Sequence, residues 1–121
     1  MKRNTFKVPI YNFDITVIQV ESSADKEAVS KEFKKMRIPE DAYQDSLEAI
    51  EKGYMNGGET FRNMLIKRFL IIIYPCSSET VRREIMGHEK RHIEDRILEH
   101  LGIDDIEANA YLAGYLSQYM Y

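Results

Sequence analysis

His88 and His92 are separated by three residues, and Glu89 follows the first of them, so residues 88–92 read His-Glu-x-x-His. On a helix, residues four apart lie on one face, roughly 6 Å apart along the axis. Two imidazoles at that spacing can bind one metal ion with Zn–N distances of about 2.0–2.1 Å. The glutamate beside the first histidine can then face the open side of the metal. The pattern therefore predicts a zinc site with two histidine ligands and Glu89 as a general base.

A catalytic zinc site needs a third protein ligand and a position left open for water. The extended motif with a third histidine is absent, because Asp95 and Leu98 occupy the positions of its glycine and its histidine. A second kind of zinc site with the same two histidines takes its third ligand, a glutamate, from the following helix. Gly102 makes the connection to that helix short, so the two helices can form a tight hairpin. Glu107 falls in the first turns of the second helix, where it can face back toward the two histidines.

Residues 88–92 and the later run Glu107-Ala-Asn-Ala-Tyr-Leu-Ala113 resemble known proteins. Together they look like the compact gluzincin-type metallopeptidases of the IrrE/ImmA kind, which show His-Glu-x-x-His and then a Glu-Ala-Asn-x-aromatic-Ala helix. The resemblance covers about residues 77–116. It implies that His88, His92 and Glu107 hold Zn²⁺ and that Glu89 is the general base. It also implies a prokaryotic or mobile-element setting.

The reaction expected of such a site is hydrolysis of a peptide bond in a protein or peptide substrate. Zinc lowers the pKa of its bound water toward about 7 and polarises the scissile carbonyl. Glu89 takes a proton from that water and passes it to the leaving amine. The oxyanion usually needs a second donor, and Tyr111 and Tyr115 follow Glu107 at four and eight residues. The alternative for each tyrosine is core packing with its hydroxyl at the surface.

Two further residues have roles that the sequence leaves open. His100 lies eight residues after His92 on the same predicted helix. We interpret it as a C-terminal residue favoured by the helix dipole, or as a substitute ligand if Glu107 faces away. Cys76 lies just before the motif helix, and we expect it to be structural rather than a redox sensor.

Two hypotheses compete with an active peptidase. The first is a zinc-bound but catalytically inactive protein-interaction module of phage or mobile-element type, since 121 residues leave little material for an extended substrate cleft. The second is a small structural or interaction protein in which the motif is accidental. In that case the motif lies on a solvated helix face, because Arg82, Arg83, Lys90 and Arg91 crowd the same segment.

Two helices must position these residues. Ser77 or Ser78 can cap the first, which is predicted to end at residue 101 because Gly102 follows. A last helix is predicted to start near residues 104–105 and to run toward residue 117.

The preceding part of the chain predicts strands, two helices and further strands. Residues 69–74 are apolar on both faces of a strand, which favours a central position in a sheet. The expected elements are two strands within 6–20 with a break at 11–12, helices at about 24–36 and 41–52, a turn at 56–58 and a strand at 67–74. The order indicates an α+β class, and we expect a small zincin-like domain with a twisted, mainly antiparallel sheet packed on helices.

Length and composition limit the remaining possibilities. The 121 residues predict one domain over residues 1–121, and 44% hydrophobic with 31% charged residues is typical of a soluble globular protein. A net charge of −3 argues against a nucleic-acid binder. A single cysteine forms no intrachain disulfide, and the longest apolar run, residues 69–74, is too short for a membrane span. With no signal-peptide pattern, the expected location is the cytoplasm; the oligomeric state is left open.

Overall fold

The computed structural model of the chain describes residues 1–102 and 106–121, and the side chains at 106 and 107 lie outside that description. Strands and helices alternate in groups along the chain, which confirms the α+β class. In chain order they are β1 (Lys2–Val8), β2 (Phe13–Gln19), the short 3-10 helix η1 (Ser23–Asp25), α1 (Lys26–Lys35), α2 (Glu40–Glu51), β3 (Gly58–Asn63), β4 (Arg68–Ile73), α3 (Glu79–Leu101) and α4 (Ile106–Met120).

The four strands form one mixed sheet in the order β1-β2-β4-β3. The β1–β2 and β3–β4 pairs are antiparallel, whereas the central pair, β2 and β4, is parallel. The parallel pair arises because the chain leaves β2, passes through α1 and α2, and adds β3 at the edge before it returns to the middle as β4. Two of the three strand pairs are antiparallel, as expected of a mainly antiparallel sheet, while the parallel central pair makes the sheet mixed. β3 is an edge strand.

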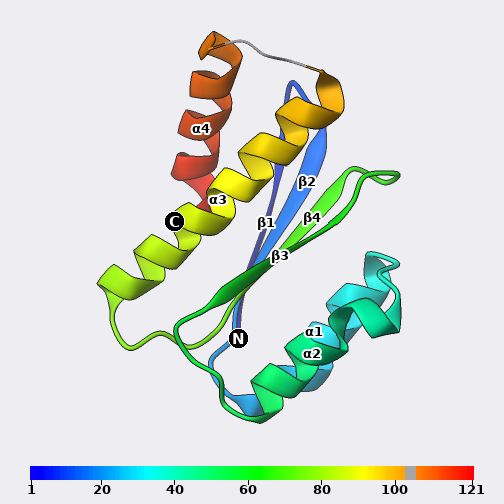
Figure 1. Cartoon of the computed structure of the whole chain (residues 1–121), viewed down its shortest axis with the longest axis vertical. Coiled ribbons are helices and arrows are strands. Elements are labelled where there is room, and N and C mark those ends of the chain that lie inside the picture. The colour runs from blue at the N-terminus through cyan, green and yellow to red at the C-terminus, as the bar shows by residue number, and fades with distance from the viewer. Residues whose placement is uncertain (103–105) are drawn as a thin grey trace.

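Helices cover both faces of the sheet, with α3 and α4 on one side and α1 and α2 on the other (Figure 1). Successive side chains of a strand point to opposite faces. Phe69, Ile71 and Ile73 of β4 therefore pack with α3 and α4, while Leu70 and Ile72 pack with α1 and α2. The central position predicted for this strand is confirmed, and its apolar residues on both faces are the reason for it.

Local signals predicted most of the helix ends. Ser78 is the N-cap of α3, and its hydroxyl accepts a hydrogen bond from the amide of Val81. Gly102 ends α3 with φ +66°, a conformation that glycine adopts without steric cost. The predicted helix at 24–36 is shorter as an α-helix, since Ser22 caps η1 first and α1 begins at Lys26. The start predicted near residues 104–105 lies outside the described residues.

Although α3 is 23 residues long, charged side chains occur along its whole length. Within residues 1–102 and 106–121, no helix has the length and apolar character needed to cross a membrane.

Candidate metal centre

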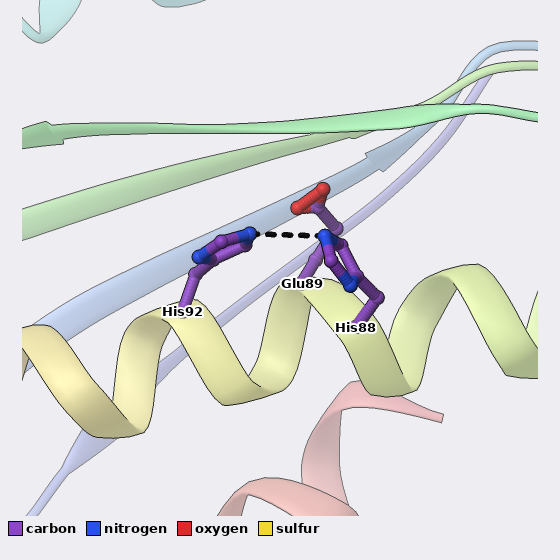
Figure 2. Close-up of side chains that lie close together, drawn as sticks. All are labelled: His88, Glu89 and His92. Carbon is purple, nitrogen blue, oxygen red and sulfur yellow. Dashed lines mark hydrogen bonds between the residues drawn. The ribbon is translucent and has the colours of Figure 1, made fainter.

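One face of α3 carries the two motif histidines toward a common point. The Nε2 atoms of His88 and His92 lie 3.0 Å apart, and their ring planes are almost perpendicular, at 88° (Figure 2). An ion about 2.05 Å from both nitrogens would bind them at an angle of about 94°. Widening the separation to about 3.3 Å would give a tetrahedral angle. Both rings are exposed, so water and an ion can reach these nitrogens.

Glu89 lies between this pair and the sheet, and its side chain is almost fully buried, with 3% exposed. A carboxylate oxygen of Glu89 lies within 4.8 Å of the ligand nitrogens of both histidines. Its Oε2 accepts a hydrogen bond of 2.9 Å from the hydroxyl of Thr60 in β3. A strand residue distant in sequence therefore holds the carboxylate next to the two imidazoles.

The edge strand approaches α3 closely at Gly58. A Cβ atom added there would lie 2.8 Å from Cγ2 of Ile85 and 3.2 Å from Cγ of Glu89. Real Cβ atoms essentially never lie within 3.0 Å of another atom, so a side chain at this position would force Ile85 to shift. Gly58 thus lets β3 run directly along the motif face of α3.

A cleft of about 500 Å³ lies between β3 and α3, and the metal-binding face forms part of its wall. In the described part of the chain, no strand pairs with the outer edge of β3, so its backbone groups remain available to a further strand. The cleft is lined from β3 by Gly58, Glu59, Thr60, Phe61 and Arg62, and from α3 by His88, Glu89, His92 and Arg96.

No family model, curated protein or solved structure matches this chain. The chemistry of the site is therefore argued from its own residues. Among the described residues, His88, Glu89 and His92 are a group of side chains close enough together to hold a metal ion. Imidazole nitrogens and carboxylate oxygens are donor atoms that suit Zn²⁺.

The side chain of Glu107, the predicted third ligand, lies outside the described residues. The helices around it form an antiparallel pair (Figure 1). In this pair the ammonium of Lys90 donates to the hydroxyl of Ser117 at 3.0 Å. The first residue of α4, at position 106, precedes Ser117 by eleven residues, or about 16 Å along a helix axis. The first turn of α4 thus starts beside the C-terminal part of α3, more than two turns beyond His92.

The two tyrosines predicted as oxyanion donors face another part of the molecule. The hydroxyl of Tyr115 donates to the backbone carbonyl of Lys7 at 2.7 Å. The ring of Tyr111 lies edge-on to Tyr11, with 6.3 Å between centroids. Neither lines the cleft, because α4 packs these rings toward the β1–β2 hairpin. The contact of Tyr115 agrees with the packing alternative, whereas Tyr111 is 40% exposed beside Tyr11.

The remaining histidine and the cysteine also lie outside the metal-binding group. His100 packs its ring edge-on against Phe13, with 5.9 Å between centroids. Cys76 donates its thiol hydrogen to the carbonyl of Tyr74 at 3.2 Å, and burial raises the pKa of this thiol. A protonated, hydrogen-bonded thiol fits the structural role expected of Cys76.

Several cleft residues were not singled out from the sequence, among them Thr60, Arg62 and Arg96. Arg96 follows His92 by four residues, so helical spacing alone could have placed it on the motif face. The two strand residues gave no such signal, because nothing local indicates which strand lies against the motif helix.

Proposed function

We propose that this protein is a zinc-dependent peptidase with Zn²⁺ bound by His88 and His92 and with Glu89 as the general base. The observation that carries the proposal is the convergence of two exposed imidazole nitrogens, 3.0 Å apart, beside a buried carboxylate in a cleft. A zincin-like arrangement, in which the motif helix packs against an edge strand, is part of this proposal.

Bound zinc would supply a Lewis acid that lowers the pKa of water and polarises a carbonyl. The protein's own groups would do the rest. Glu89 would accept the proton of the attacking water and deliver it to the leaving amine. Thr60, through its hydrogen bond, would hold one oxygen of that carboxylate and leave the other for the proton. The free edge of β3 would hold a substrate peptide in an extended conformation by strand addition.

Glu107 remains the predicted third ligand. The register of α3 and α4 in the described residues favours a second candidate function, because the first turn of α4 starts beyond His92. In that case zinc has fewer protein ligands than a catalytic site usually offers, and the protein is a zinc-bound but inactive interaction module. Glu107→Gln separates the two: lowered zinc affinity supports the peptidase site, and unchanged affinity supports the module.

Zinc content tests the metal site directly. We expect one Zn²⁺ per chain after reconstitution and dialysis, measured by plasma mass spectrometry, and loss of that zinc in His88→Ala and His92→Ala. His100→Ala is the matched control, since it removes a histidine of the same helix that packs against Phe13. If the wild-type protein contains no zinc after reconstitution, both candidate functions are wrong.

Hydrolysis of a library of internally quenched peptides then separates a peptidase from a binding module. Glu89→Gln should keep its zinc and lose about 10²- to 10⁴-fold in rate, the usual contribution of a general base. Equal turnover by Glu89→Gln and the wild-type protein would remove Glu89 from the mechanism.

A further inference from the structure

The cleft continues past the metal-binding group to an end lined by two arginines. Arg62 is two residues beyond Thr60 in β3, so its side chain projects from the same face of the strand. Arg96 is one helical turn beyond His92 and continues the motif face of α3. Both arginines line the cleft, one from each wall.

The described residues do little to neutralise these two guanidinium groups. Among the described residues, Arg62 takes part in none of the ion pairs. The described ion pairs include one for Arg96, with Glu99 at 3.0 Å, and both partners are exposed on one helix face. Such a surface pair contributes little and is easily exchanged for another partner.

The carboxylates of the cleft are engaged elsewhere. Glu59 lines the cleft through its strand but accepts a hydrogen bond from the hydroxyl of Ser46 in α2, on the opposite face of the sheet. Glu89 is bonded to Thr60 beside the histidines. The arginine end of the cleft therefore carries positive charge that no carboxylate among the described lining residues balances.

We propose that Arg62 and Arg96 bind a carboxylate of an extended peptide lying in the cleft, from an acidic side chain or from the chain terminus. Planar guanidinium groups match the geometry of a carboxylate and form charge-assisted hydrogen bonds with it. Two strand residues beyond Thr60 span about 6.6 Å, and four helix residues beyond His92 span about 6 Å. The carboxylate therefore lies about two peptide residues from the bond held at the metal. This inference rests on the proposed function for its use of the cleft.

Binding of synthetic peptides to the zinc-reconstituted Glu89→Gln variant of residues 1–121 tests the inference. The probes are dansyl-labelled octapeptides of Ala and Ser with an amidated C-terminus, in which one Glu occupies each position in turn. Gln and Lys counterparts of each peptide provide the comparison. We expect the preferred Glu peptide to bind about five- to tenfold more tightly than its Gln counterpart in 50 mM NaCl. The preference should shrink in 500 mM NaCl because salt screens exposed charges.

Substitutions connect that preference to the two arginines. Arg62→Ala or Arg96→Ala should reduce it to within twofold, whereas Arg62→Lys combined with Arg96→Lys should retain part of it. Arg91→Ala is the matched control, an exposed arginine of α3 that does not line the cleft. The double charge reversal Arg62→Glu with Arg96→Glu should make the Lys peptide the tightest binder.

A second arm identifies the source of the carboxylate. The Gln peptides are prepared with a free C-terminal acid, and a gain that depends on both arginines assigns the chain terminus rather than a side chain. Equal affinities for all Glu, Gln, Lys and free-acid peptides would overturn the inference, as would the absence of measurable binding by any of them. If the wild-type protein hydrolyses peptides without a charge preference, this inference is wrong and the proposed peptidase function stands. If peptides bind with a charge preference but are not hydrolysed, the inference stands and the peptidase function is wrong.

Discussion

Replacing Thr60 by valine removes the hydroxyl that donates to the buried carboxylate of Glu89 at 2.9 Å. Valine keeps the size and the strand preference of threonine. A hydrogen bond to a charged group contributes about 1.5–3 kcal/mol, and loss of the donor leaves a carboxylate with only 3% of its surface exposed to water. We expect zinc-free Thr60→Val to lose about 1.5–3 kcal/mol of unfolding free energy at pH 7. For a domain of this length the loss corresponds to roughly 5–15 °C in Tm.

Urea unfolding followed by circular dichroism, in the presence of a chelator, measures this loss. Thr5→Val is the matched control, since its hydroxyl forms a 3.0 Å hydrogen bond with Thr16 at an exposed strand position. That variant should change stability by less than about 0.5 kcal/mol. In a Glu89→Met background the Thr60→Val substitution should also cost less than about 0.5 kcal/mol, because the acceptor is gone. An equal cost with and without the Glu89 carboxylate would refute the reasoning.

Two further predictions concern tyrosines outside the cleft. Tyr115→Phe removes the hydrogen bond to the Lys7 carbonyl and should cost about 0.5–1.5 kcal/mol in urea unfolding. Peptide hydrolysis and zinc content should be unchanged. A hundredfold loss in the rate of hydrolysis would instead support Tyr115 as a hydrogen-bond donor to the oxyanion. Burial raises the pKa of Tyr74 to about 12, above the value near 10 of an unfolded chain. The unfolded state thus releases this proton first, so stability should be lost as pH rises from about 10 toward 12. Tyr74→Phe should flatten that decline, and an equally steep decline in the variant would show that other groups cause it.

Much of the site's helical part follows from the sequence because it depends on local geometry. The helical repeat places residues four apart on one face whatever surrounds them, and the imidazoles of His88 and His92 do meet. Helix ends behave in the same way, since Ser78 and Gly102 act through backbone groups within a few residues. The third ligand, Glu107, was predicted on the neighbouring helix. Whether a residue of that helix reaches the histidines depends on how the two helices pack as well as on local sequence.

The sequence by itself therefore determined the α+β class, the buried central strand and the pair of imidazoles on one face of a helix. Tertiary structure alone decided that β3 lies at the sheet edge, so that Thr60 reaches Glu89 across 29 positions of sequence. It also turned Tyr115 toward the hairpin, since α4 buries Leu112 and Leu116 and leaves its tyrosines on the side of β1. The physical reason is that spacing along one element fixes which side chains share a face, whereas the partner of that face is chosen by packing the whole core.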